Sequence, residues 1–192
     1  LMPEPYCDEQ DTFIRDYFKT GIKMVIGIQR EFMGKRKNGN IFPLELSVNE
    51  MRLESRRMFV GAVRDITGRR KAEHELRVLS MAVDQSPAAV VITDVKGRIE
   101  YVNPQFVKTS GYTLEDAKGQ KMNIIKSGYM SSKIYADLWE TITSGQEWRG
   151  ELYNKKKSGG LFWEKVSISP IKNHEGVITH FVGIQEDITI QK

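Results

Sequence analysis

The sequence FVGIQEDIT at Phe181–Thr189 nearly repeats FVGAVRDIT at Phe59–Thr67, 122 residues earlier. A second pair of matching segments precedes it, since KKKSGGLF at Lys155–Phe162 resembles KRKNGNIF at Lys35–Phe42, at an offset of 120 residues. Two matches in the same order indicate two copies of one structural unit, and such a repeat constrains the fold more than any local pattern does. The positions at which the copies differ then show what one copy has and the other lacks.

The composition is that of an ordinary globular protein. The 192 residues are 40% hydrophobic and 28% charged, which suits one or two domains. The single cysteine, Cys7, excludes an internal disulfide framework and fits a reducing compartment, so we expect a cytoplasmic location. We expect no membrane span, because no apolar run approaches the ~18 residues that one needs. The chain begins at Leu1, and we take it as a piece of a longer protein.

The net charge of +4 comes from scattered lysines and arginines, two clusters of which lie in expected hairpin turns. Nucleic-acid binding needs a continuous basic stripe with groups that read or stack on bases. We therefore expect no nucleic-acid partner.

The first copy is expected to be a helix followed by a three-stranded antiparallel meander. Helical spacing of Phe13, Ile14 and Phe18 predicts the helix over Asp11–Thr20. Asn38-Gly39 is a strong hairpin signal between the first two strands. The three runs rich in β-forming residues are Met24–Lys35, Ile41–Leu53 and Arg57–Thr67.

A charged segment with helical periodicity joins the two copies. Its apolar residues Ala72, Leu76, Leu79 and Val83 are spaced four, three and four apart, as in the seam of a coiled coil. About five turns are too short for a stable coiled coil alone, so we expect this linker helix to pair with its twin in a homodimer. The alternative is a helix that packs on its own domain.

The second copy is longer and predicts an α+β domain. A hairpin around Lys96-Gly97 is followed by short helical pieces, a longer helix and three strands that match the first copy. The expected strands are Val90–Thr93, Arg98–Val102, Glu147–Lys156, Gly160–Ile171 and Val177–Ile188, and the expected helices are Pro104–Ser110, Leu114–Lys118 and Lys133–Thr143. This order predicts a five-stranded antiparallel sheet with its helices gathered on one face.

Several motifs of the second copy together resemble a PAS domain. They are ITDVKGRIEYVNPQF, GYTLED and the closing FVGIQEDIT, and the resemblance covers Val83–Lys192. The first copy resembles only the back half of such a domain. The resemblance implies a PAS fold preceded by a partial PAS copy and a linker helix, with domain bounds at 1–67, 68–86 and 87–192.

The LMPEPY, IGIQR and FVGAVRDIT segments of the first copy are similar to the haem-binding PAS oxygen sensors of the FixL type. In that family a histidine on the helix after MPEPY ligates the haem iron. The matching position here is Gln10, and glutamine does not replace imidazole as an axial ligand. We therefore expect no haem in the first copy.

The second copy carries polar residues on its last three strands where the first is apolar. Strand periodicity places Asn154, Glu164 and Gln185 on the sheet face that the helices cover, where polar groups are costly unless they are satisfied. The matching residues of the first copy are Gly34, Leu44 and Val63. A flavin ring would satisfy such a set, because its pyrimidine edge pairs with amides while apolar walls hold the ring.

The spacing Trp148-x-Gly150-x3-Asn154 and the IIKSG loop resemble the redox-sensing PAS domain of the NifL type, which binds FAD. The resemblance implies FAD as cofactor, with Lys126 at the dinucleotide phosphates. The other expected cofactor-binding residues are Met122, Trp148, Asn154, Glu164 and Gln185. Met122 lies where the related LOV photoreceptors have a cysteine, which implies that no cysteinyl photoadduct forms. Glu164 departs from the LOV pattern, which has asparagine there.

The sequence therefore predicts a sensory module that reports redox or ligand state to a C-terminal output domain, a kinase or a cyclase, outside this chain. The alternative is a ligand-free PAS module that only dimerises a histidine kinase or diguanylate cyclase, since similar motifs occur in PAS domains without a known ligand. We expect no enzyme activity, because no nucleophile–base pair, metal-ligand spacing or phosphate loop is present.

Overall fold

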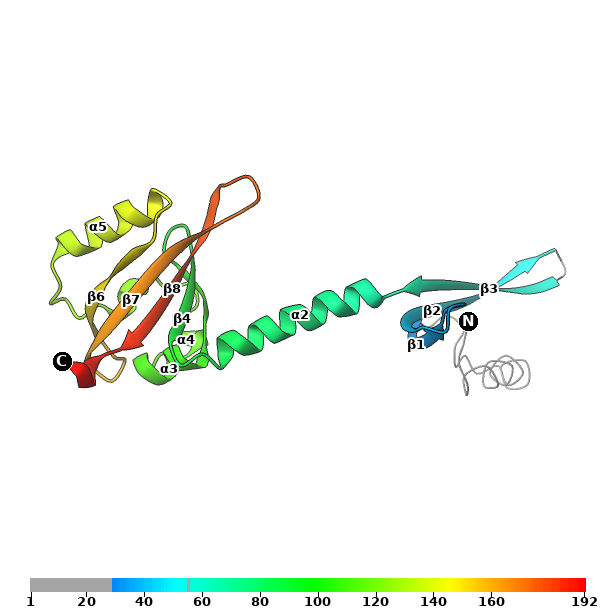
Figure 1. Cartoon of the computed structure of the whole chain (residues 1–192), viewed down its shortest axis with the longest axis horizontal. Helices are drawn as coiled ribbons and strands as arrows, with labels where there is room; N and C mark the ends of the chain where they lie inside the picture. The colour runs from blue at the N-terminus through cyan, green and yellow to red at the C-terminus, as the bar shows by residue number, and fades with distance from the viewer. Residues whose placement is uncertain (1–28, 55) are drawn as a thin grey trace. The chain divides into compact units, whose positions relative to one another are not determined.

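The computed structural model describes residues 29–54 and 56–192 (Figure 1). The chain forms two compact units, Leu1–Arg77 and Val78–Lys192. The expected helix over Asp11–Thr20 and the haem-ligand position Gln10 lie outside the described residues. Among the described residues, no helix is both long enough and apolar enough to cross a membrane.

The first unit contains an antiparallel meander in the order β1-β2-β3. Its strands are β1 (Gln29–Lys35), β2 (Ile41–Leu53) and β3 (Arg56–Asp65). The predicted hairpin is confirmed, because Gly39 has a φ of 88° and the Asn38 side chain accepts a hydrogen bond from the Asn40 N–H at 3.1 Å. Phe42, Leu44 and Leu46 alternate along β2 and form a small buried cluster.

Helix α2 (Thr67–Asp84) confirms the expected linker helix, and none of its residues is buried. Leu76 and Leu79, two residues of the expected seam, are 67% and 64% exposed. Within the first unit, Glu31 of β1 forms ion pairs with Arg69 and Arg70 at the start of the helix. The two leucines, Leu76 and Leu79, are therefore presented to solvent.

The second unit is the predicted five-stranded antiparallel sheet, in the order β5-β4-β8-β7-β6 (Figure 1). Its strands are β4 (Ala89–Asp94), β5 (Ile99–Val102), β6 (Trp148–Lys155), β7 (Leu161–Lys172) and β8 (Ile178–Asp187). Its helices are α3 (Pro104–Ser110), α4 (Leu114–Ala117), the 3-10 helix η1 (Met122–Ile125), α5 (Ser132–Thr143) and the terminal 3-10 helix η2 (Thr189–Gln191).

Two apolar clusters fill the space between the sheet and its helices. One joins β4 and β5 to α3, α4 and η1, around Val91, Ile99 and Phe106. The other joins α5 to the last three strands, around Leu138 and Phe181. The helices thus cover one sheet face, as the sequence predicts.

Asn103 fixes the start of the helical segment. Its side-chain oxygen accepts hydrogen bonds from the N–H groups of Val90 (2.9 Å) and Phe106 (3.1 Å), and the second of these caps α3. Its amide nitrogen donates to the carbonyls of Val83 and Ala88, both at 3.0 Å. One fully buried side chain therefore ties the end of α2, strand β4 and helix α3 together.

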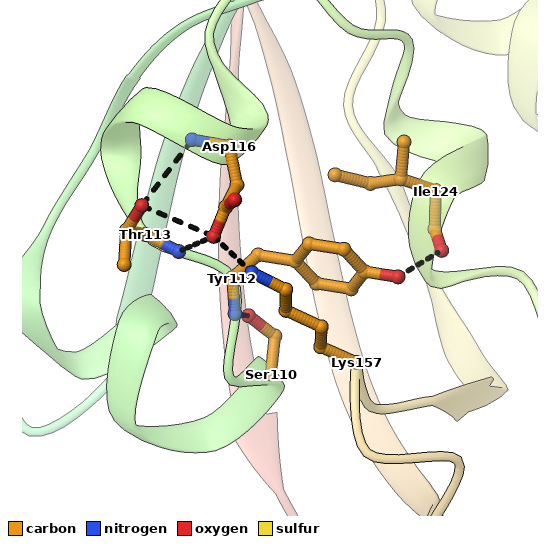
Figure 2. Close-up of polar contacts among 6 residues, drawn as sticks. All are labelled: Ser110, Tyr112, Thr113, Asp116, Ile124 and Lys157. Carbon is orange, nitrogen blue, oxygen red and sulfur yellow. Dashed lines mark hydrogen bonds and ion pairs between the residues drawn. The ribbon is translucent and has the colours of Figure 1, made fainter.

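The GYTLED turn holds the helical segment against the β6–β7 hairpin (Figure 2). Thr113 and Asp116 form a reciprocal capping box at the start of α4, and Asp116 also accepts from the Lys157 ammonium at 2.6 Å. Lys157 also donates its backbone N–H to the Ser110 carbonyl at 2.8 Å. The Tyr112 hydroxyl donates to the Ile124 carbonyl at 3.3 Å, which links this turn to η1.

Candidate functional site

A cavity of about 330 Å³ lies in the second unit, between the sheet and the segment that runs from η1 to α5. Its walls are mainly apolar and include Leu138, Ile142, Leu152, Val166 and Phe181. The volume is at the small end of the ~300–1,000 Å³ range of ligand sites, so it suits one ring system rather than a whole dinucleotide. Any larger ligand would extend out of the cavity.

Four of the six sequence-predicted site residues line this cavity: Met122, Lys126, Asn154 and Gln185. Met122 lies on η1, Lys126 directly follows it, and the two amides come from β6 and β8. Backbone pairing between Lys126 and Asn154 brings the end of the helical segment onto strand β6. Trp148 and Glu164 are buried but do not belong to the lining.

Glu164 lies next to Asn154 and interacts with it directly. The Asn154 Nδ2 donates a hydrogen bond to Glu164 Oε2 at 2.7 Å, and the two side chains are 2% and 1% exposed. Burial raises the pKa of Glu164 to about 7, against the opposing effect of the Asn154 hydrogen bond. A carboxyl group with a raised pKa therefore accepts a hydrogen bond from an amide that lines the cavity.

Two buried side-chain oxygens lack a hydrogen-bond partner among the described residues, and both belong to residues that line this cavity. They are Gln185 Oε1 on β8 and the Tyr135 hydroxyl on α5. An unsatisfied buried polar atom costs about 1–3 kcal/mol, and in a native structure it calls for an explanation. A ligand that donates a hydrogen bond to Gln185 Oε1 and forms another with the Tyr135 hydroxyl would satisfy both.

Tyr135 also contacts Lys126. The Lys126 ammonium lies 3.5 Å from the centre of the Tyr135 ring, a cation–π contact at the edge of the cavity. Burial lowers the pKa of Lys126 and raises the pKa of Tyr135. The lysine is therefore a partly dehydrated cation close to the cavity.

Trp148 supports the site from within the core. Its indole N–H donates to Asp137 Oδ2 of α5 at 2.9 Å, which fastens α5 to β6. A Cβ on Gly150 would lie 2.4 Å from the Trp148 ring, so the glycine makes room for the indole to lie along the strand. The Trp-x-Gly spacing thus has a packing role here. The expected contact between Trp148 and a flavin stays a prediction.

Sequence reasoning missed Tyr135 and Trp139 as cavity residues. A signal was present, since Tyr135 precedes Leu138, Trp139 and Ile142 by three, four and seven residues, which places all four on one face of α5. The hydroxyl of Tyr135 distinguishes it from an ordinary core residue only once the cavity is visible.

In the described part of the first unit, apolar packing takes the places of Asn154 and Glu164, as the repeat predicts. Leu44, which matches Glu164, is 2% exposed and packs with Phe42 and Leu46. A Cβ on Gly34, which matches Asn154, would lie 2.4 Å from the Leu44 side chain, so apolar packing fills that place. Among the described residues, no group of His, Cys, Asp or Glu could hold a metal ion.

The fold of the second unit agrees with the proteins to which the chain is similar. A family model described as "PAS domain" matches residues 3–68 and 87–189. The chain belongs to the PAS domain family. The nitrogen fixation regulatory protein of Klebsiella oxytoca is 33% identical over 108 residues, which are 56% of this chain and 22% of that protein. Sensor protein FixL of Bradyrhizobium diazoefficiens is 39% identical over 79 residues, which are 41% of this chain and 16% of that protein.

A solved PAS domain of a protein from Colwellia psychrerythraea has the same fold. It superposes with a TM-score of 0.57 at 27% identity, over 60% of this chain and 98% of that one. The present chain spans less than a quarter of the length of the two relatives named above. It is thus a PAS sensory region, homologous to parts of longer regulatory and sensor proteins.

Proposed function

We propose that the second unit is a flavin-binding PAS sensor, with FAD as its cofactor, that reports redox or ligand state to an output domain outside this chain. The observation that carries the proposal is a pair of buried oxygens in one apolar cavity, Gln185 Oε1 and the Tyr135 hydroxyl, which find no hydrogen-bond partner in the part of the chain that the structure describes. The NifL-type spacing of Trp148, Gly150 and Asn154 supports FAD in particular.

The residues present fit the ring of a flavin. Apolar walls suit its flat faces, while Asn154 and Gln185 offer amide groups to its pyrimidine edge. FAD would supply a ring whose hydrogen-bonding groups change with its oxidation state. Glu164 would hold the Asn154 amide in a fixed orientation through the 2.7 Å hydrogen bond. Lys126 would meet the phosphates outside the cavity.

Strand β8 connects this site to the C-terminal exit. Gln185 lies two residues before Asp187, whose carboxylate accepts the backbone N–H of Thr189 at 2.9 Å. The Thr189 hydroxyl in turn accepts from the Trp163 N–H of β7 at 3.0 Å. A reoriented Gln185 side chain would shift β8 against β7 and bias the start of whatever follows Lys192, which is the coupling we propose.

The partner we propose is a second copy of this chain, joined through α2. The helix buries none of its residues, and Leu76 and Leu79 present apolar surface in a coiled-coil spacing. The output domain would be a kinase or a cyclase. The second candidate function is a ligand-free dimerisation module, and the exposed seam of α2 is the observation that favours it.

The test is reconstitution of the purified chain with FAD. A sensor binds FAD, shows protein-bound flavin absorption and gains thermal stability, whereas a module that stays colourless after reconstitution overturns the proposal. Asn154→Ala combined with Gln185→Leu should lose most of the bound flavin while keeping the fold. The matched control is Asn173→Ala, in the β7–β8 turn, and full flavin content in the double variant would contradict the site.

A further inference from the structure

We propose that Lys96, Lys121 and Lys126 form an anion-binding mouth that takes the phosphate or pyrophosphate group of a flavin nucleotide. The mouth would select the nucleotide over riboflavin, which has the same ring but no phosphate. This inference rests on the proposed flavin site and extends the role expected of Lys126 to Lys121, at the other end of η1, and to Lys96 in the β4–β5 turn.

The first support is the charge of the cavity lining. All three lysines belong to it, and no Asp or Glu does. None of the three forms an ion pair within 4.0 Å among the described residues. By contrast, Lys157 and Lys192 pair with carboxylates at 2.6 and 2.8 Å. Asp94, whose carboxylate accepts the Lys96 backbone N–H at 2.8 Å, offsets part of the Lys96 charge. Three cations in one cavity lining still create a local positive potential that attracts anions.

The second support is that the backbone holds two of these lysines side by side. Lys96 lies in the β4–β5 turn and Lys121 directly precedes η1. The Met122 N–H donates to the Gly97 carbonyl at 3.2 Å, and the Ile99 N–H donates to the Gln120 carbonyl at 2.8 Å. Segments from two parts of the chain are therefore fixed against each other at the rim.

The third support is the state of Lys126. Its ammonium is partly desolvated and lies 3.5 Å from the centre of the Tyr135 ring. A phosphate would compensate this cation better than a ring face does, because charge-assisted hydrogen bonds are about twice as strong as neutral ones. Lysine suits such a contact, since its flexible ammonium acts as a compact point charge.

The volume of the cavity explains why the anion would lie at this mouth. About 330 Å³ holds a ring system, so the remainder of a nucleotide must leave through the opening, past the rim lysines. A ligand with an apolar ring inside and a phosphate outside matches the apolar walls and the cationic rim together.

The experiment compares the binding of riboflavin, FMN and FAD to the whole chain by flavin fluorescence at low and high salt. We expect the wild-type chain to bind FMN and FAD roughly tenfold or more tightly than riboflavin at low salt, with the advantage shrinking as salt rises. In the Lys96→Ala, Lys121→Ala, Lys126→Ala triple variant the three affinities should converge on that of riboflavin.

Riboflavin affinity serves as the folding control, because the triple variant should keep it within about twofold if the ring site is intact. Lys165→Ala, on the opposite face of the sheet, should leave every affinity unchanged. If the triple alanine variant no longer binds riboflavin, its ring site is damaged, and a triple Lys→Arg variant that keeps the three positive charges replaces it. That variant must still bind FMN and FAD more tightly than riboflavin.

Equal binding of the three flavins by the wild-type chain overturns this inference and leaves the proposed function standing. Binding of none of them overturns both. The last measurement adds inorganic pyrophosphate, which should compete with FAD for binding but should not compete with riboflavin. If pyrophosphate stabilises the wild-type chain while the flavins show no phosphate preference, the mouth binds free anions and the nucleotide assignment is wrong.

Discussion

Asn154 and Glu164 form a hydrogen-bonded pair across strands β6 and β7, with 2.7 Å between the amide nitrogen and the carboxyl oxygen. Both side chains are almost fully buried, and the carboxyl does not line the cavity that the amide lines. Asn154 therefore provides a direct hydrogen-bond link between the Glu164 carboxyl and the cavity.

The first prediction concerns the pH dependence of stability. Burial raises the pKa of Glu164 from 4.5 to about 7, so the folded state holds this proton more tightly than the unfolded state. The stability that this group contributes is therefore complete below pH 4.5 and is lost as pH rises to about 7. Glu164→Gln keeps an acceptor for Asn154 without the charge, and its advantage over wild type should grow with pH, by on the order of 3 kcal/mol.

The measurement is urea unfolding between pH 5 and pH 8, followed by tryptophan fluorescence. All three tryptophans of the chain, Trp139, Trp148 and Trp163, lie in the second unit, so the signal reports that unit alone. Glu186→Gln, an exposed residue of β8, is the control and should change no slope. A pH-independent difference between Glu164→Gln and wild type would show that Glu164 does not titrate in this range.

The second prediction concerns the unpartnered Tyr135 hydroxyl. Tyr135→Phe removes a buried polar atom that has no hydrogen-bond partner among the described residues. Without ligand, the variant should be more stable than wild type by about 1 kcal/mol, while its affinity for flavin should fall. Tyr129→Phe is the matched control, because Tyr129 is 73% exposed. Thermal melts with and without FAD measure both effects, and a destabilised ligand-free Tyr135→Phe variant would contradict the prediction.

The third prediction concerns Asn103, whose buried side chain makes four hydrogen bonds. Asn103→Ala should cost about 3 kcal/mol or more, because it removes the cap of α3 and leaves buried backbone groups unpaired. Asn103→Asp should cost at least as much, because it keeps the acceptor but turns a buried carboxyl oxygen toward the carbonyls of Val83 and Ala88. Urea midpoints by tryptophan fluorescence rank the three proteins, and an unchanged midpoint for Asn103→Ala would refute the role assigned to this residue.

The fourth prediction concerns the seam of α2. Leu76→Glu with Leu79→Glu should convert a dimer to a monomer, because like charges would replace the apolar contact between two helices. His74→Glu with Val78→Glu changes positions off the seam and should leave the mass of the assembly unchanged. Light scattering coupled to size-exclusion chromatography measures that mass. A dimer that survives in the seam variant would place the interface elsewhere.

Local sequence determined the elements of this protein. Strand β2 and helix α3 have the predicted bounds, because turn residues and proline mark their ends and clear alternation marks β2. The burial of Asn154, Glu164 and Gln185 also followed from the sequence, since strand period and the comparison with the first copy placed them on the covered face. These properties depend on neighbours along the chain or on the repeat.

Tertiary structure alone decided how those residues act. It set Glu164 behind Asn154 rather than at the cavity and put Trp148 into the core with Asp137. It also left buried oxygens of Gln185 and Tyr135 without a hydrogen-bond partner among residues 29–54 and 56–192. It also brought Lys96 and Lys121 together from segments 25 residues apart. Sequence periodicity gives the face on which a side chain lies, but hydrogen-bond partners and cavities arise from packing between distant segments, which no local pattern records.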